Sequence, residues 1–332
     1  MVTSNLIKAG QLYEILPDGS WNFFLDSSML RQFLECEQSF KYKYVDHIRL
    51  KGGPNFKMAV GSWWSSFMEL YYNAHRAGTN LKLVDVIEYA AHAWDELNMD
   101  ALGAEYPASL QEFGGKNGAV VMATEYFQWA RPLDLARWTV VSVEEGSGRL
   151  RELLITDGRG DVRVYYIVKP DLFVIEDGVL TPVDHKTKDF INPKMIHSYK
   201  PHHQMLSYIN AAQELASQLG LKTTVDRCTI NVAARKVKKN GDSARFQRIP
   251  VQYSQSQIEE WRHRVLEAAR RLRYCIYNNV WGWNDNACHV YAGCMYRPID
   301  SQPPASRQVI INSSFVKGSP WTPYKTEEEE DN

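Results

Sequence analysis

The sequence predicts an α/β protein, and three observations support this prediction. Residues 170–175 and 180–188 are apolar runs joined by Glu176-Asp177-Gly178, and Asp-Gly between such runs is a strong signal for a β-hairpin. Residues 202–219 repeat apolar side chains at helical spacing and end at Gly220, a residue favoured just after a helix. Further β-rich runs span 138–144, 150–156, 162–168 and 229–233. We expect the first three of these runs to begin the sheet that ends in the hairpin.

The chain before these strands is mainly helical by pattern. Asp26 and the serines after it supply capping chemistry for a helix that continues to about residue 35. A second helix begins at Gly61 and carries Trp63 and Trp64, which we expect in the core. Residues 80–136 again show apolar side chains at helical spacing, interrupted at Pro107 and at Gly114-Gly115. We interpret this segment as a helical insertion.

Composition places the chain among globular proteins. It has 332 residues, of which 44% are apolar and 23% charged, so a sizeable core is expected. Its five cysteines are few, scattered and odd in number, which argues against a disulfide framework. We find no signal-peptide pattern and no apolar run of the ~20 residues needed to cross a bilayer, so we expect a cytoplasmic protein with no membrane partner.

The hairpin carries the residues that indicate chemistry. Asp171 opens one strand, and Asp184 and Lys186 lie two residues apart on the other, which places both on the same face. Two carboxylates that converge from paired strands suit Mg²⁺ or Mn²⁺, with substrate phosphate oxygens and waters completing the coordination. A lone Asp-x-Lys is common, and by itself it would indicate an ordinary surface ion pair.

The flanking context resembles the PD-(D/E)XK nuclease superfamily. The pattern here is Pro170-Asp171 followed by Asp184-His185-Lys186, and the Thr after the lysine is similar to the RecB-like exonuclease branch, which includes recombination and CRISPR-associated nucleases. Residues 28–44 resemble the same branch, although Glu37 replaces the proline that usually follows the cysteine. The resemblance implies a restriction-endonuclease-like core, with a mixed central β-sheet flanked by helices.

The resemblance also implies roles for individual residues. Asp171 and Asp184 would hold Mg²⁺ or Mn²⁺, helped by the His185 carbonyl and by Glu69, while Lys186 would orient the attacking water. Ser65 stands where relatives carry a histidine that is often a metal ligand, so we expect fewer protein ligands or a different metal preference.

A second implied element lies eighteen residues after the lysine. Gln204 and Tyr208 are four apart on one helix face and match a Gln-x-x-x-Tyr element of RecB-like nucleases. There the pair lies near the active lysine and the DNA strand. By itself this spacing means little, and its position after the hairpin gives it weight.

Basic residues follow the strand at 229–233. Four of them are Arg235, Lys236, Lys238 and Lys239. They would either bind DNA phosphates or form an ordinary solvated hairpin loop, and the sequence favours neither. A long helix over about 256–277 carries five arginines and is a second candidate. The formal net charge is −1, but Glu327–Asp331 contribute −5, so the rest of the chain carries +4.

The cysteines raise the question of a metal cluster. In several RecB-like nucleases, one N-terminal and several C-terminal cysteines hold a [4Fe–4S] cluster with four thiolates. Here Cys36, Cys288 and Cys294 match, and the fourth is absent. Three interpretations stay open: a cluster that is labile or is completed by Asp285 or Asp300, a zinc site that uses His289, and cysteines that simply pack.

We therefore expect a metal-dependent DNA exonuclease of phage or bacterial recombination and repair, in the cytoplasm of a bacterial or phage-infected cell. It would act on linear DNA, at ends or on single strands, with a single-strand annealing protein or a helicase as partner. The alternatives are an inactive or weakly active DNA-binding or assembly subunit and a site-specific endonuclease. The expected division is an N-terminal arm at 1–26, a nuclease domain at 27–300 and an extended tail at 301–332 with a disordered acidic end.

Overall fold

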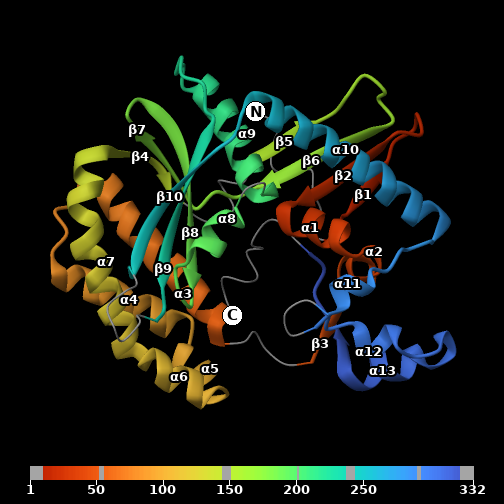
Figure 1. Cartoon of the computed structure of the whole chain (residues 1–332), viewed down its shortest axis with the longest axis horizontal. Helices are drawn as coiled ribbons and strands as arrows, with labels where there is room; N and C mark the ends of the chain where they lie inside the picture. The colour runs from red at the N-terminus through yellow and green to blue at the C-terminus, as the bar shows by residue number, and fades with distance from the viewer. Residues whose placement is uncertain are drawn as a thin grey trace. The chain divides into compact units, whose positions relative to one another are not determined.

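The computed structural model describes residues 10–51, 56–143, 151–199, 202–236, 244–289 and 293–321. These residues form two compact units, each assembled from segments that are distant in the sequence (Figure 1). Unit 1 comprises the described residues within Met1–Gly52, Gly146–Val168 and Gln255–Asn332, and unit 2 those within Gly53–Glu145 and Lys169–Ser254. The predicted hairpin and the helix after it belong to unit 2.

The sheet of unit 2 has five strands in the order β10-β9-β8-β7-β4. The strands are β4 (Trp138–Val143), β7 (Leu172–Glu176), β8 (Val179–Lys188), β9 (Arg227–Ala234) and β10 (Phe246–Gln252). β8 pairs in parallel with β9, and the other neighbours are antiparallel. The sheet is therefore mixed, which confirms the predicted α/β class.

The hairpin of β7 and β8 closes through a two-residue turn. Glu176 pairs with Val179, and the two residues between them both have positive φ, 51° at Asp177 and 77° at Gly178. This is the type I′ geometry that favours Asp-Gly, because its twist matches that of the strands. The turn sets the register that pairs Leu172 with Val183, so the residues flanking these two lie at the same end of the hairpin.

Seven helices accompany this sheet in the described part of unit 2. They are α3 (Phe56–Arg76), α4 (Leu83–Glu96), α5 (Met99–Ala104), α6 (Pro107–Phe113), α7 (Gly115–Arg137), α8 (Pro193–His197) and α9 (His203–Gln218). The segment interpreted as an insertion consists of α4 to α7. α3 contacts β4 and β8, and it buries Trp63 and Trp64 in the core as predicted.

Unit 1 has a four-stranded sheet in the order β1-β2-β6-β5, in which β2 and β6 are parallel. The strands are β1 (Tyr13–Ile15), β2 (Trp21–Asp26), β5 (Arg151–Ile155) and β6 (Val162–Val168), and a second sheet pairs β3 (Ile48–Leu50) with β11 (Phe315–Lys317). Its helices are α1 (Ser27–Glu35), α2 (Glu37–Phe40), η1 (Lys41–Val45), α10 (Gln255–Asn278), α11 (Asp285–Cys288), α12 (Arg297–Asp300), η3 (Pro304–Ser306) and α13 (Arg307–Ser314). None of the described helices is long and apolar enough to cross a membrane.

The cap of α1 agrees with the sequence prediction. The Asp26 carboxylate accepts hydrogen bonds from the backbone N–H groups of Ser28 and Met29, each at 2.8 Å. These two donors have no partner inside the helix, so the carboxylate stabilises its first turn.

Two expectations about local structure are wrong. The runs predicted at 150–156 and 162–168 contain β5 and β6, but β6 pairs with β2 and β5 pairs with β6 in unit 1, and neither pairs with the hairpin. Alternating side chains show which face of a strand is buried and do not identify its neighbour. The tail expected to be extended contains α13, whereas the predicted N-terminal arm contains β1 and β2. The predicted boundaries at 26 and 300 stay predictions, and the acidic end at 327–331 lies outside the described residues.

Candidate active site

The site begins with the alternation of side chains along β8. Asp184 and Lys186 point to the same face of the strand, and Lys186 Nζ lies 2.8 Å from Asp184 Oδ1. The Asp184 side chain is fully buried, whereas 29% of the Lys186 side chain is exposed. The Lys186 side chain is therefore partly exposed, whereas the carboxylate that it binds is not.

Asp171 completes the predicted trio at the same end of the hairpin. It precedes β7, and its Oδ2 accepts a hydrogen bond of 2.6 Å from the backbone N–H of His185. This bond fastens the Asp171 carboxylate to the middle residue of the Asp-x-Lys tripeptide. The structure thus brings together Asp171, Asp184 and Lys186, as the hairpin predicted.

The charges of this group depend on one another. Burial raises the pKa of Asp184 above its usual value, and the Lys186 ammonium opposes that rise. Burial alone would lower the pKa of Lys186, but the carboxylates of Asp184 and Asp171 outweigh it, so this pKa is raised. Lys186 therefore keeps its positive charge, as required of a group that is to stabilise a phosphate.

The Gln-x-x-x-Tyr element reaches this group from α9. Gln204 Nε2 lies 3.1 Å from Asp184 Oδ1 and 2.8 Å from the hydroxyl of Tyr208. The Tyr208 hydroxyl also donates to the carbonyl of Lys169 at 2.9 Å. A hydrogen-bond chain thus runs from the backbone just before Asp171 to the Asp184 carboxylate.

The second oxygen of Asp184 is left for another partner. Oδ2 is buried, and it has no hydrogen-bond partner among the described residues, while Oδ1 is occupied by Lys186 and Gln204. A buried carboxylate oxygen without a donor is costly, and a cation would satisfy it. Mg²⁺ sites usually take one or two carboxylates together with substrate phosphates and waters, so Asp171 and Asp184 fit such an ion.

The wider predicted ligand set has less support. Within the described ranges, no three His, Cys, Asp or Glu side chains are gathered in a way that could hold a metal ion. Glu69, on α3, is therefore not part of such a group with Asp171 and Asp184. Ligation by Glu69 and by the His185 carbonyl stays a prediction.

The His185 side chain points to the opposite face of β8, toward α3. Its ring stacks on Tyr72 with centroids 5.5 Å apart, and its Nδ1 lies 3.1 Å from Asn231 Nδ2. Burial, together with the charges of Arg248 and Lys186, lowers the pKa of His185 to about 3. The imidazole is therefore neutral near pH 7 and is held away from Asp184.

Asn231 leads from His185 into a buried polar network. Its Nδ2 donates to the Tyr126 hydroxyl at 2.6 Å, and the Tyr126 and Tyr72 hydroxyls are 2.7 Å apart. Tyr72 also donates to Asp134 Oδ2 at 3.2 Å, and the other oxygen of Asp134 is bound by Arg248. The middle residue of the tripeptide is thus tied to α7 and β10 through the core.

Sequence analysis missed this network, although two signals were present. Tyr126, Ala130 and Asp134 are four residues apart, so the helix that carries them places an acid on its buried face. Phe246 and Arg248 alternate along β10, which places an arginine beside a buried aromatic ring. A buried acid and a buried arginine in one domain are expected to pair, because either alone would be costly.

Two of the four loop candidates for DNA contact are already paired with carboxylates. Arg235 donates to Asp189 Oδ1 at 2.9 Å, and Asp189 also binds Lys57 at 2.8 Å. Lys236 forms an ion pair with Glu112. The other two, Lys238 and Lys239, lie outside the described residues, and DNA contact by all four stays a prediction.

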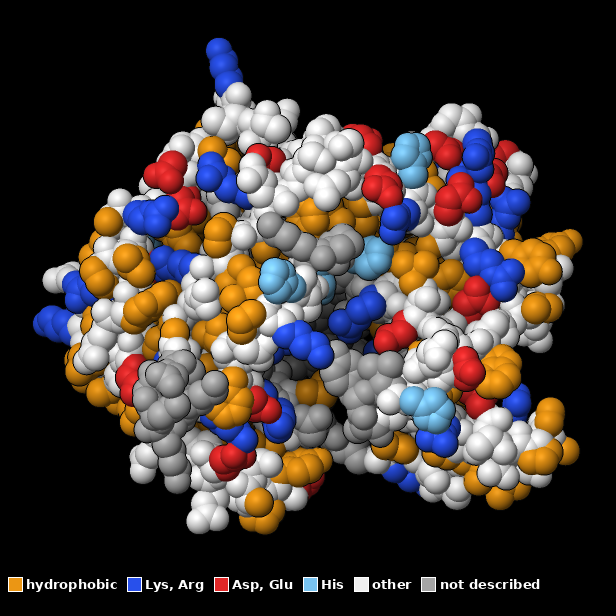
Figure 2. Space-filling view, viewed as in Figure 1, with side chains coloured by type: hydrophobic (Ala, Val, Ile, Leu, Met, Phe, Trp, Pro, Cys, Tyr) orange, Lys and Arg blue, Asp and Glu red, His pale blue; other side chains and the backbone are white. Residues whose placement is uncertain are grey.

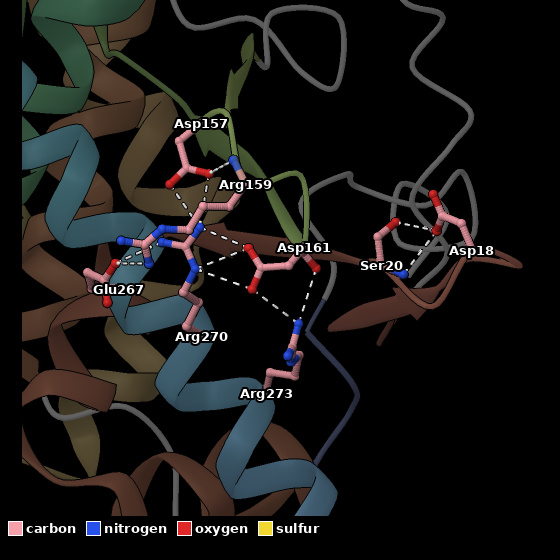
Figure 3. A network of polar contacts seen from close by, with 8 residues as sticks. All are labelled: Asp18, Ser20, Asp157, Arg159, Asp161, Glu267, Arg270 and Arg273. Atoms are coloured by element: carbon pink, nitrogen blue, oxygen red, sulfur yellow. Dashed lines mark hydrogen bonds and ion pairs between the residues drawn. The ribbon is translucent and has the colours of Figure 1, made fainter.

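The arginines of α10 are used within unit 1. Figure 3 shows Arg270 between Asp157 and Asp161, with Nη2 at 2.8 and 2.9 Å from their carboxylates, and Arg273 beside Asp161 as well. The carboxylates lie in the turn between β5 and β6, so these arginines fasten that turn to α10. On the face in Figure 2, described Lys and Arg side chains are interspersed with Asp and Glu side chains.

The three candidate cysteines lie in unit 1. Burial raises the pKa of Cys288 and of Cys294, and each of these thiols is also influenced by Cys36 and Asp300. All three thiols are free, and the described residues contain no arrangement of three such side chains that could hold a metal. The described residues thus add no support for a [4Fe–4S] cluster or a zinc ion, and we assign no step to either. Such a group stays a prediction.

Comparison with known proteins adds one firm result. The model of the family described as the PD-(D/E)XK nuclease superfamily matches residues 27–299. Among solved structures, the chain is similar to an alkaline exonuclease, LHK-Exo, from Laribacter hongkongensis, with 14% identity and a TM-score of 0.23 over 47% of this chain and 71% of that one. A TM-score this low carries no argument. None of the curated proteins compared with the chain matches it.

Proposed function

This chain belongs to the PD-(D/E)XK nuclease superfamily, and from that premise we propose that it is a deoxyribonuclease dependent on Mg²⁺ or Mn²⁺. One observation carries the proposal: Asp171, Asp184 and Lys186 meet at one end of the hairpin, and Asp184 Oδ2 has no hydrogen-bond partner among the described residues. An ordinary surface ion pair would not bury a carboxylate completely.

The residues of the site divide the work of phosphodiester hydrolysis. A divalent ion held by Asp171 and Asp184 would activate water and offset charge on the phosphate. Lys186 would orient the attacking water and stabilise the negative charge that develops on the phosphate oxygens. Asp184 Oδ1 holds the ammonium in place, and Gln204 and Tyr208 brace that carboxylate from α9.

The finer part of the proposal is an exonuclease of phage or bacterial recombination and repair. It is supported by the resemblance of residues 28–44, and of Gln204 with Tyr208, to the RecB-like branch. The substrate would be linear DNA, at ends or on single strands, in the cytoplasm of a bacterial or phage-infected cell. A single-strand annealing protein or a helicase would be the partner.

The test compares wild type with Lys186→Ala on end-labelled linear and circular DNA, single- and double-stranded, with Mg²⁺, Mn²⁺ or chelator. We expect metal-dependent loss of linear but not circular DNA, and a loss of about 10²–10³-fold or more in rate for the variant. DNA affinity should stay nearly unchanged. The matched control is Lys194→Ala, which removes an exposed lysine of the same unit.

Each other outcome has a definite meaning. Cleavage by Lys186→Ala at the wild-type rate would refute the site assignment. Cleavage of circular DNA would indicate an endonuclease. Binding without cleavage of any substrate by the wild type would identify a non-catalytic DNA-binding subunit.

A further inference from the structure

Unit 1 contains a groove that the proposed active site does not use. It has a volume of about 980 Å³ and is formed by η1, the chain after α10, α13 and β11. Binding sites for small ligands typically measure about 300–1,000 Å³, so this groove is at the upper end of that range. Its size suits an extended ligand better than a single small molecule.

The charged side chains of the groove are mainly basic. Lys41, Arg307 and Lys317 line it, and Asp46 is the one carboxylate among the described lining residues. Asp46 pairs with Lys41 at 2.6 Å, and Arg307 Nε donates to the carbonyl of Gln302 at 3.3 Å. The excess of two positive charges favours an anionic ligand, and each arginine or lysine is suited to a phosphate.

The other lining side chains suit nucleic-acid bases. Trp281 is half-buried, and its Nε1 donates to the Asn279 side chain at 3.2 Å, which holds the ring in place. Ile311 and the half-exposed Val316 add apolar surface, and four amide side chains add donors and acceptors: Gln38, Asn279, Gln308 and Asn312. Aromatic surface beside cations is the usual composition of a site for single-stranded nucleic acid.

We propose that this groove binds a short segment of single-stranded DNA, with phosphates at Arg307 and Lys317 and a base on Trp281. The proposal rests on the proposed function, because it takes DNA as the substrate class. It adds a site for a DNA strand whose residues all belong to unit 1, whereas the proposed catalytic residues Asp171, Asp184 and Lys186 belong to unit 2.

The experiment measures binding of fluorescent oligo-dT by anisotropy over a range of salt, with chelator present to prevent cleavage. Arg307→Gln/Lys317→Gln should bind several-fold more weakly, and its log–log salt slope should fall by about 1.4, since each phosphate contact to a single strand contributes about 0.7. Trp281→Ala should weaken binding by about fivefold or more with the same slope. The matched control Arg264→Gln/Lys222→Gln removes the same charge from exposed positions outside the groove.

Cleavage rates over a range of linear DNA concentrations separate this proposal from the previous one. The groove variants should keep the wild-type kcat and raise KM, whereas Lys186→Ala lowers kcat. Because binding is read without metal, a failure of the nuclease assignment leaves the groove test intact. An equal fall in salt slope for the control variant would refute the groove.

Two further outcomes would overturn the choice of ligand. Competition by thymidine monophosphate at the same concentration as the oligonucleotide would show a mononucleotide site. The second arm replaces Glu327–Glu330 with glutamine. Tighter oligo-dT binding by that variant, with no such gain in the Arg307→Gln/Lys317→Gln background, would show that the acidic end of this chain occupies the groove.

Discussion

Unit 2 contains two ion pairs that look alike and have different surroundings. Lys186 and Asp184 lie on β8, and Arg248 of β10 pairs with Asp134 of α7. In both pairs the carboxylate is almost completely inaccessible to solvent, and burial raises its pKa while the cation opposes that rise. Charge alone therefore does not distinguish them.

The two carboxylates differ in how completely they are bound. Asp134 has both oxygens occupied, one by Arg248 and the other by the hydroxyls of Tyr71 and Tyr72 at 3.3 and 3.2 Å. Arg248 is also covered by the Trp138 ring, with its guanidinium carbon 3.6 Å from the ring centroid. Asp184 instead leaves Oδ2 without a described donor, and its cation is twice as exposed, 29% against 15%.

The contrast separates a structural pair from the pair of the candidate active site. A carboxylate with both oxygens satisfied has no capacity for a ligand, so the Asp134 pair serves the core. A carboxylate with one oxygen left over, next to a lysine whose side chain is partly exposed, is able to take up a cation and a phosphate. Between these two carboxylates, the unoccupied oxygen, and not burial, distinguishes the candidate site.

The largest expected effect is on stability, at the pair of Arg248 and Asp134, which we call the closed pair because both carboxylate oxygens are occupied. Arg248→Met should lower the free energy of unfolding by about 3–5 kcal/mol, because it leaves Asp134 buried without a cation. Urea denaturation measures this loss. The matched double variant Arg248→Met/Asp134→Asn removes both charges and should recover part of it. A cost below about 1 kcal/mol for the single variant would contradict the structural role.

The pair of Lys186 and Asp184, which we call the open pair, should respond in the opposite way, with a small effect on stability and a large effect on cleavage. Asp184→Asn keeps the shape of the side chain and an acceptor for Gln204, and Asp171 still attracts the Lys186 ammonium. Relief of carboxylate burial offsets the lost pair, so the unfolding free energy should change by about 1 kcal/mol or less. Cleavage should fall by about 10²-fold or more, since the metal loses a ligand. A large loss of stability with activity retained would reverse the comparison.

The smallest effect concerns His185. In the sequence it lies between Asp184 and Lys186, but its side chain belongs to the buried network of Asn231 and Tyr72. Its pKa is about 3 when folded, against 6.5 in the unfolded chain, so only the unfolded chain gains this proton between those pH values. The stability is therefore complete above pH 6.5 and is lost as the pH falls toward 3. At pH 5 the loss should be about 2 kcal/mol relative to neutral pH.

The measurement is the unfolding free energy from pH 8 to pH 5 for wild type and His185→Gln. The glutamine keeps an acceptor for Asn231 but does not titrate in this range. As the pH falls, the unfolding free energy of the wild type should decrease relative to that of His185→Gln. Parallel pH profiles would show that His185 is not held neutral by the network.

The sequence itself determined the local features of the site. Asp177 and Gly178 set the hairpin turn, the turn set the register, and the register brought Asp171 to the tripeptide of Asp184 and Lys186. Gln204 and Tyr208 could be assigned to one helix face from their spacing alone, and the structure places both on the Asp184 carboxylate or next to it. Such features depend on residues that are close in the chain, where backbone geometry leaves few choices.

Only the tertiary structure decided which distant parts meet. The strands at 151–155 and 162–168 joined the sheet of unit 1 that contains β1 and β2, although their pattern would have suited the hairpin sheet equally. Asp134 and Arg248 are 114 residues apart, and no local rule selects one as the partner of the other. Packing selects these partners, because burial makes an unpaired strand edge or charge costly, and that cost appears only when the whole unit has folded.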